Sequence, residues 1–450
     1  MRPTVALCAS AGGAMIVALD GTVLVLAQPR IGRDLHASVP LVQWTGTGYL
    51  VAVAALLVVA GRLGDRYGHG RLLGSGALGF AAASAGIAVA PGIGWVIALR
   101  VAQGVFGALL QPATLALLRL AYPPDRLAAP VAIRTSAIGL AGAAGPVLGG
   151  ALVAHLGWRA VFVLTVPAAL AIAALAYAVR VPLPARRDRH TRRVSKSRWP
   201  AAPERSRLDL DLPGAALLAA TLGVLVWALS VRWYPGLALA ALAAGLLVRH
   251  ERRAADPIVP IPVWRARAVT AALGLLATVA AGMFGALFAA TWLVQDVLRL
   301  DPLATGLRVL PLTVLMVVGA PVAGLLLRHH PPSRVAVAGT LLSAAGIAGF
   351  VLLSRNWLVD GLVFGVLGAG FAAVMVTATG SVVGDAPPGY AGVVGGLKQT
   401  AINIGTAVGI AVAASTMSAV VLATIAAAGL VPALLLPGRV AGRRAERVST

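Results

Sequence analysis

The chain has 450 residues, of which 59% are hydrophobic and only 12% are charged, with 52 Gly and 28 Pro. A water-soluble chain carries roughly twice that share of charge, so the composition excludes an ordinary soluble fold. The 37 Lys and Arg against 15 Asp and Glu give a net charge of +22. These basic residues form short clusters between long apolar stretches, which indicates a polytopic membrane protein rather than a nucleic-acid binder.

Apolar runs of about 20 residues are long enough to cross roughly 30 Å of hydrocarbon as helices. The first run contains Asp20, and no small-residue cleavage site follows it, so it reads as a retained helix and not as a signal peptide. Ser415 and Thr416 give a weak turn signal between the last two runs. The sequence therefore predicts an all-α polytopic membrane protein with fourteen transmembrane helices, at about 5–27, 41–60, 72–90, 94–118, 133–154, 160–179, 213–230, 235–248, 268–291, 304–327, 335–354, 359–383, 391–414 and 417–437.

The distribution of basic residues orients these helices, because loops on the cytoplasmic side retain Lys and Arg. With the N-terminus inside, 28 of the 37 basic residues fall in inner segments and seven in outer ones, which leaves Arg100 and Lys398 within spans. Tryptophan supports this topology, since it falls at each of the first six outer loops. We therefore expect both termini in the cytoplasm. The excess of Arg over Lys, 35 to two, hints at a GC-rich bacterial genome and hence at the bacterial cytoplasmic membrane.

Loop lengths divide the chain into helical groups of six, two and six. The longest polar stretch, rich in Arg, Pro and Ser, reads as a flexible basic linker on the cytoplasmic side. The predicted parts are a six-helix bundle at 1–180, the linker at 181–211, two additional helices at 212–249, a cytoplasmic connection at 250–267, a second six-helix bundle at 268–438 and a cytoplasmic tail at 439–450.

Asp20 is the acidic residue that the predicted spans place well inside the membrane. An unpaired charge there costs several kcal/mol, so Asp20 is expected to face a cavity, where it takes up and releases a proton or pairs with a cation. Arg100 is the natural basic partner, and Gln103 lies one turn further on the same helix. The alternatives are that Asp20 reaches water at a helix end, and that Arg100 reaches the headgroups near Trp95.

Two glycine-rich motifs occur in the first half of the chain. One lies between the second and third predicted spans, and the other lies within the fifth. GRLGDRYGHGR fills a tight inner loop in which glycines allow sharp turning, although alone it is equally typical of a positive-inside loop. GLAGAAGPVLGG combines small residues at three- and four-residue spacing with a proline that bends its helix. The residues of interest are Gly61, Gly64, Asp65, Arg66, Gly68 and Arg71 in the first motif and Gly142, Gly145, Pro146, Gly149 and Gly150 in the second.

The ordered set LDGTVLVLAQP, GRLGDRYGHGR, RVAQGVFGA and GAAGPVLGG resembles the major facilitator superfamily, and more narrowly its fourteen-helix drug:proton antiporters. WLVQDVLRLDPLATGLRVLP and GVVGGLKQTAINIGTAVG are also similar to that family's later helices, so the resemblance covers nearly the whole chain. It implies a major facilitator fold, with two six-helix bundles and two extra central helices.

The resemblance also implies roles for individual residues. Asp20 would be the acidic site of the first helix and Arg100 the membrane-embedded arginine associated with proton coupling. The loop around Asp65 would be the conformational latch, and Gly145 with Pro146 the antiporter signature. We expect the substrate cavity to include Gln103, Gln399 and Asn403.

The expected function is proton-coupled export of apolar or cationic drug-like compounds by a monomeric secondary transporter. Its partners would be a small-molecule substrate, protons and the bilayer, with no nucleic acid. No cofactor or metal is expected, since the histidines lie in loops or at span ends and no phosphate-binding GxxxxGK[ST] motif occurs. The alternatives are a membrane-embedded enzyme acting on lipid or isoprenoid, with Asp296 and Asp301 as its outer acidic pair, and an uptake transporter of the same fold.

Overall fold

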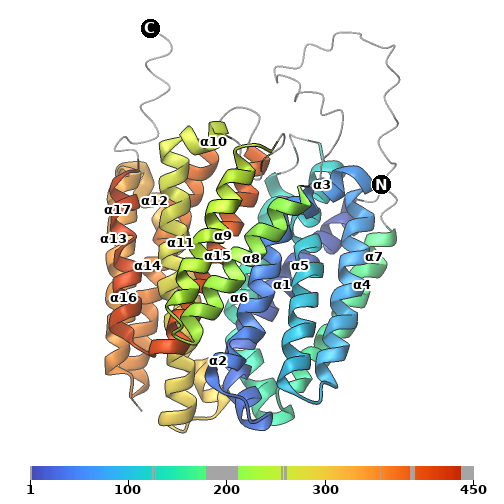
Figure 1. Ribbon diagram of the computed structural model, residues 1–450. Helices are drawn as coiled ribbons and strands as arrows, with labels where there is room; N and C mark the ends of the chain where they lie inside the picture. Colours follow the sequence, from blue (N-terminus) through green and yellow to red (C-terminus); the bar gives the residue numbers. More distant parts are fainter. Residues whose placement is uncertain are drawn as a thin grey trace, which may run out of the picture.

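The computed structural model describes residues 3–123, 126, 128–178, 211–254, 257, 261–354, 356–385 and 391–436. In that part of the chain, the long helices lie side by side, roughly parallel or antiparallel, in one bundle (Figure 1). In chain order they are α1 (Pro3–Asp34), α2 (Val39–Val42), α3 (Trp44–Tyr67), α4 (His69–Ala88), α5 (Ile93–Ala121), α6 (Ala128–Leu156), α7 (Arg159–Ala178), α8 (Leu212–Ser230), α9 (Pro235–Glu251), α10 (Ile261–Arg265), α11 (Arg267–Trp292), the π-helix η2 (Leu293–Val297), α12 (Pro302–His329), α13 (Pro332–Ala348), the 3₁₀ helix η3 (Gly349–Leu352), α14 (Trp357–Gly384), α15 (Ala391–Thr416), α16 (Ala419–Ala427) and α17 (Leu430–Leu434).

Each predicted apolar run falls on a helix or, for the last run, on the pair α16 and α17. Eleven helices in the described part are long and apolar enough to span a membrane, and α6 makes a twelfth if its bent halves form one span. The remaining two runs correspond to α9, with 17 residues, and to the short stretch Ala419–Leu434. The chain is therefore a multi-pass all-helical membrane protein, and the count of fourteen spans stays a prediction.

Two halves of the bundle repeat the same packing. In the front half α1 packs on α6, α3 on α5, and α4 on both α5 and α7. In the back half α11 packs on α15, α12 on α14, and α13 on both α14 and α16. The halves are therefore related as a repeat in which α6 corresponds to α15. They meet where α6 packs on α12 and where α15 packs on α3.

The extra hairpin of α8 and α9 lies between the two halves (Figure 1). Helix α8 packs on both α3 and α15, with Leu222 and Val226 in a shared apolar cluster. Gln43 Nε2 also donates a 2.8 Å hydrogen bond to Ser230 Oγ, which fastens the far end of α8 to the start of α3. The hairpin therefore covers the seam between α3 and α15. The predicted linker 181–211, apart from Asp211, and the predicted tail 439–450 lie outside the described residues.

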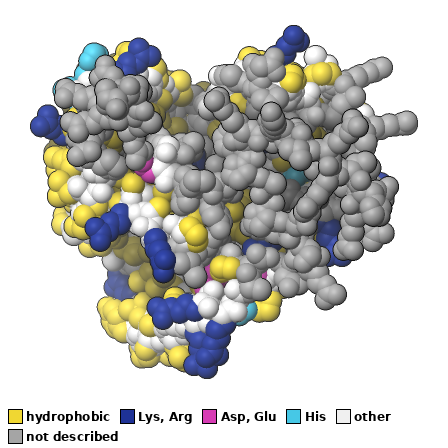
Figure 2. Space-filling model, turned by 90° about the horizontal axis from the view of Figure 1, so that it is seen from above, with side chains coloured by type: hydrophobic (Ala, Val, Ile, Leu, Met, Phe, Trp, Pro, Cys, Tyr) yellow, Lys and Arg dark blue, Asp and Glu magenta, His cyan; other side chains and the backbone are white. Residues whose placement is uncertain are grey.

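The two ends of the bundle are named here after the short helices that lie at them, the α2 end and the α10 end (Figure 1). Seen from the α10 end, Lys and Arg side chains are spread over the face and few acidic side chains appear (Figure 2). Helices α1, α6, α11 and α15 run from the α10 end toward the α2 end, and α12 runs back.

Helix α6 bends by 41° between Ala129–Gly142 and Ala144–Leu156. Pro146 follows the bend within one turn, as expected because proline removes the backbone hydrogen bond to the preceding turn. Two small residues of this motif lie against α1. A Cβ on Gly145 would overlap Thr22, and one on Gly149 would lie 2.7 Å from a methyl of Val23. The glycines thus let α6 pack closely against α1.

Candidate functional site

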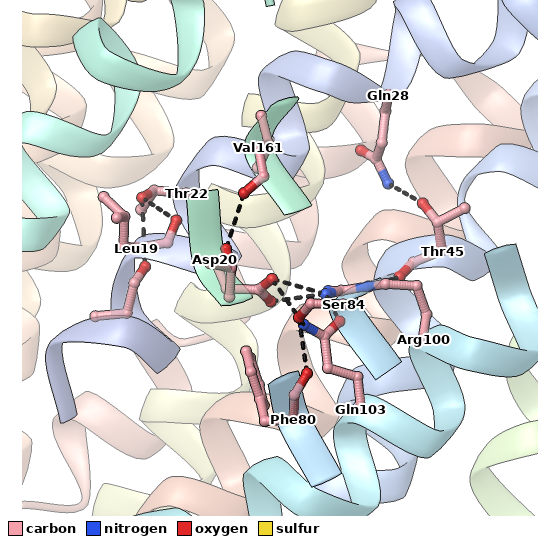
Figure 3. A network of polar contacts seen from close by, with 12 residues as sticks. Leu19, Asp20, Thr22, Gln28, Thr45, Phe80, Ser84, Arg100, Gln103 and Val161 are labelled. Carbon is pink, nitrogen blue, oxygen red and sulfur yellow. Dashed lines mark hydrogen bonds and ion pairs between the residues drawn. The ribbon is translucent and has the colours of Figure 1, made fainter. Parts of the chain in front are cut away.

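The site begins with Asp20, which lies in the middle of α1 with a side chain only 1% exposed. Its two carboxylate oxygens accept hydrogen bonds of 2.9 and 2.7 Å from Arg100 Nη1 (Figure 3). Gln103 Nε2 lies 3.5 Å from Asp20 Oδ1. The carboxylate of α1 is therefore held by two polar side chains of α5.

Arg100 is equally buried, with 1% of its side chain exposed. Besides Asp20, it donates from Nε to the Thr45 carbonyl at 2.7 Å and from Nη1 to Gln103 Oε1 at 2.5 Å. Its guanidinium also stacks over the Tyr49 ring at 4.6 Å. The arginine therefore ties α5 to both α1 and α3, and its charge is neutralised inside the protein.

A second set of hydrogen bonds positions Gln103. Its Nε2 donates to Ser84 Oγ at 2.9 Å, and that hydroxyl donates to the Phe80 carbonyl at 2.8 Å (Figure 3). The network thus includes α4. Because Gln103 accepts from Arg100 while donating to Ser84, its amide orientation is fixed.

The structure settles where these predicted residues lie. Asp20 does not reach water at a helix end, because it is 4% exposed as a residue, and Arg100 does not reach the headgroups, because it is 1% exposed. The predicted pairing of Asp20, Arg100 and Gln103 is confirmed as a contact. The sequence did not identify Ser84, Thr45 or Tyr49 as members of the network, since isolated hydroxyls in apolar runs carry no signal of their own.

A cavity of about 90 Å³ lies between the two halves, and the residues that line it do not include Asp20, Arg100 or Gln103. Its lining is almost entirely apolar, with hydroxyls only from Thr22 and Thr313. Helix α1 contributes Thr22, Val25 and Leu26, so the same helix carries Asp20 and one wall of the cavity. The other lining residues are Gly142, Pro146, Met283, Phe284, Leu287, Val309, Leu312, Met316 and Phe371.

The predicted substrate residues Gln103, Gln399 and Asn403 do not line this cavity, and their role in binding substrate stays a prediction. Gln103 lies in the ion-pair network, and neither Gln399 nor Asn403 belongs to the cavity wall. On α15, Gln399 Nε2 donates to Asn403 Oδ1 at 3.1 Å. By contrast, Gly142 and Pro146 of the predicted antiporter motif line the cavity directly. A volume of 90 Å³ is well below the roughly 300–1,000 Å³ of sites for drug-sized ligands, so the halves must separate before such a ligand enters.

The two halves touch closely toward the α2 end. A Cβ on Gly150 would lie 2.5 Å from the Pro302 carbonyl, and one on Gly306 would overlap the Pro146 carbonyl. Gly142, two turns toward the α10 end, has no neighbour within 4 Å of a built Cβ. Helices α6 and α12 therefore meet at backbone distance near the α2 end and diverge toward the α10 end.

Side chains reinforce the closure at the α2 end. Gln295 Nε2, in the π-helix η2, donates a buried 3.0 Å hydrogen bond to the Leu26 carbonyl of α1. The Trp292 ring packs against Gly32, and Arg33 Nε lies 3.8 Å from Asp296 Oδ1. In this state the central cavity is closed from the α2 end.

The motif that the sequence places in a tight inner loop is almost entirely helical, so the connection is shorter than predicted. Helix α3 continues through Gly61, Gly64 and Arg66 to Tyr67, and only Gly68 separates it from α4. Gly68 has φ 94°, a conformation that side-chain-bearing residues rarely adopt. A Cβ on Gly64 would overlap the imidazole of His69. Arg71 is exposed, and the Asp65 side chain lies outside the part that the structure describes.

Asp20 is not the sole buried acid, contrary to expectation. Asp360, near the start of α14, is completely buried and accepts a 2.8 Å hydrogen bond from Arg308 Nε on α12. Its other oxygen accepts from the Ser354 amide at 3.0 Å. Asp360 lies close to the end of a predicted span, so the sequence did not indicate that its side chain is buried. Its partners are those of a structural ion pair between α12, α14 and the preceding loop.

No group of three or more His, Cys, Asp or Glu that could hold a metal ion occurs among the residues whose positions are described. The two acids of the enzyme alternative also have structural partners. Asp296 lies beside Arg33, and Asp301 accepts a 2.7 Å hydrogen bond from the Ala304 amide as the cap of α12.

Two halves that repeat the same packing around a central cavity, with a buried ion pair in the front half, are typical of a secondary transporter that works by alternating access. The comparisons with known proteins agree. A family model described as Major Facilitator Superfamily matches residues 10–410, so the chain belongs to that family.

Relatives are similar along most of the chain. A tetracenomycin C resistance and export protein of Streptomyces glaucescens is 39% identical over 91% of this chain and 75% of its own length. The multidrug efflux pump LfrA of Mycolicibacterium smegmatis is 31% identical, covering 91% and 80%. A puromycin resistance protein of Streptomyces alboniger is 31% identical, covering 95% and 84%.

Solved structures confirm the fold. The crystal structure of a peptide transporter, POT, in complex with sulfate matches with a TM-score of 0.66, over 96% of this chain and 93% of that one. Sequence identity is 17%, so the match concerns the fold alone.

Proposed function

We propose that this chain is a proton-coupled exporter of apolar, drug-like small molecules in the bacterial cytoplasmic membrane, with the α10 end in the cytoplasm. The orientation follows from the excess of Arg in the segments that join helices at the α10 end. The relatives named for export or resistance support the direction of transport and the substrate class.

The observation that carries the proposal is the contact between Asp20 and Arg100. Asp20 lies on α1, and the same helix forms one wall of the cavity. A proton that reaches Asp20 removes the carboxylate charge and with it the ion pair to Arg100. Arg100 keeps its hydrogen bonds to Thr45 and Gln103, so α1 loosens from α5 while α5 stays on α3. Because Thr22, Val25 and Leu26 lie on α1, the change at Asp20 reaches the cavity wall.

The energy of one proton is sufficient for useful export. One elementary charge moving through 100 mV releases about 2.3 kcal/mol, which sustains a concentration ratio of roughly fiftyfold for a neutral substrate. The apolar cavity wall suits loose binding of hydrophobic compounds, and it contains no charged side chain among its described residues.

A toxicity panel in an efflux-deficient bacterial host tests this function, with tetracenomycin C, puromycin and ethidium as probes. The proposal expects raised tolerance to at least one probe, lower intracellular probe, and loss of both effects when an uncoupler collapses the proton gradient. Accumulation of probe above the level of the empty host would indicate uptake. A chemically altered probe would indicate an enzyme. Either result would overturn the proposal.

A further inference from the structure

The ring of Tyr49 lies against the guanidinium of Arg100, at the centre of the buried network. Tyr49 is 5% exposed, and Arg100 Cζ lies 4.6 Å from the centre of its ring. Thr45, one turn earlier on α3, accepts the 2.7 Å hydrogen bond from Arg100 Nε. Two successive turns of α3 therefore hold the arginine, one through a carbonyl and one through an aromatic face.

Packing rather than hydrogen bonding fixes this ring. A Cβ on Gly104 would lie 2.6 Å from the Tyr49 carbonyl and 2.9 Å from Ala52 Cβ, so α5 and α3 meet at backbone distance here. A Cβ on Gly107 would lie 2.6 Å from Tyr49 Oη, so this glycine leaves space for the phenol. Among the described residues, no hydrogen bond uses that hydroxyl. Arg100, Gly104 and Gly107 follow at four- and three-residue spacing, so one face of α5 carries both the cation and the space for the ring that covers it.

The ring acts differently on the two protonation states of Asp20. The face of an aromatic ring is electron-rich, so it attracts a guanidinium. While Asp20 is ionised, its carboxylate compensates most of the charge of Arg100, and the ring contributes less. Once Asp20 is protonated, Arg100 keeps its charge but loses its carboxylate partner. The Tyr49 ring then stabilises a buried cation that would otherwise be unpaired.

We propose that Tyr49 is a positioning residue for proton uptake by Asp20, because its ring face serves as the electron-rich neighbour of Arg100 while Asp20 is protonated. This assignment rests on the proposed proton coupling and extends it to α3. In this step the proton binds a carboxylate oxygen of Asp20, and Arg100 keeps its hydrogen bonds to Thr45 and Gln103. In the described parts of the helices packed against α1, α3 and α5, the charged and titratable side chains other than Asp20, Tyr49 and Arg100 lie within two turns of a helix end.

Infrared titration of the purified protein tests this role without any substrate. The carbonyl band of protonated Asp20, identified by its loss in Asp20→Asn, reports the protonated fraction at each pH. A desolvated cation–π contact corresponds to a factor of roughly thirty in an equilibrium constant. Half-protonation of Asp20 in Tyr49→Leu should therefore need a proton concentration about ten- to thirtyfold higher than in wild-type protein. Tyr49→Phe keeps the ring face and should titrate as wild type.

Two further proteins separate the ring face from packing. Trifluorophenylalanine in place of Tyr49 keeps the shape of the ring but makes its face electron-poor, so it should shift the titration as Tyr49→Leu does, and it tests the role even if Tyr49→Leu does not fold. Phe106→Leu removes a ring of the same apolar cluster that packs on Gly79, and it should titrate as wild type. In proteoliposomes, ethidium export by Tyr49→Leu should fall by a similar factor at neutral pH and recover when the α2 side is acidified, which a packing defect would not do.

Two results would overturn the role of Tyr49. One is half-protonation of Asp20 at the wild-type pH in both Tyr49→Leu and the trifluorophenylalanine protein. The other is an equal shift in Tyr49→Phe, which would assign the effect to the hydroxyl. In both cases Asp20 still titrates, so the proposed function stands and only the role of the ring fails. A wild-type protein whose carbonyl bands never depend on Asp20 would instead remove Asp20 as the proton site, and both proposals with it.

Discussion

A methyl group added at Gly150 should prevent closure of the α2 end. Gly150→Ala places a Cβ 2.5 Å from the Pro302 carbonyl and 3.0 Å from Leu303 Cα, whereas ordinary contact begins at 3.4 Å. Both neighbours are backbone atoms, so α6 and α12 must separate by roughly 1 Å. Overpacking of this kind costs about 1–3 kcal/mol.

That cost applies only to the state closed at the α2 end. The ratio of open to closed molecules at this end should therefore rise roughly five- to 150-fold. The readout is labelling of a single cysteine at Leu287, which lines the cavity, by a membrane-impermeant maleimide added from the α2 side. The native Cys8 is replaced by serine beforehand, because it is exposed.

Gly142→Ala is the matched control. It adds the same methyl group to the same helix, at a position with nothing within 4 Å. Labelling should accelerate in Gly150→Ala and not in Gly142→Ala. Equal labelling rates in the two variants would refute the conclusion that the α6–α12 contact closes this end.

The remaining predictions concern the buried ion pairs and the turn between α3 and α4. Arg100→Lys should reduce transport by at least about tenfold, since one ammonium group cannot replace the planar guanidinium at all of its partners; wild-type transport rates would contradict this. Asp360→Asn should lower the free energy of unfolding by about 3–5 kcal/mol, because it breaks a buried ion pair, yet retain substrate-dependent proton flux per molecule; loss of that flux in folded protein would give this pair a direct role. Gly68→Ala should lower the melting temperature of the purified protein through a cost of roughly 1–2 kcal/mol at φ 94°, and an unchanged melting temperature would argue against this turn.

Much of the helical framework follows from the sequence. Apolar runs predicted the positions of the helices, because the bilayer imposes length and composition on any span. The turn after α15 lies close to the weak signal at Ser415 and Thr416, where Met417 adopts φ 49° and Ser418 caps α16. Helix ends were less predictable. Helix α3 continues through Gly61 and Gly64, because a glycine between helical neighbours need not end a helix.

The candidate site was predictable only in part. Asp20 and Arg100 stand out because a charge inside a span needs a partner, and the structure places them 2.7 Å apart. The sequence did not predict that Asp360 is buried, because a residue near the end of a span can also be exposed to water. The cavity walls from α11, α12 and α14 could not be foreseen, since Met283, Phe284 and Phe371 are ordinary apolar residues until the halves are assembled.

The central claim is that protonation of Asp20 drives export, and substrate-dependent proton flux in proteoliposomes tests it most directly. With a probe identified from the toxicity panel, wild-type protein should release protons into the lumen as substrate leaves it. Asp20→Asn should bind the probe and yet show no coupled proton movement. Coupled flux at the wild-type rate in Asp20→Asn would contradict the account.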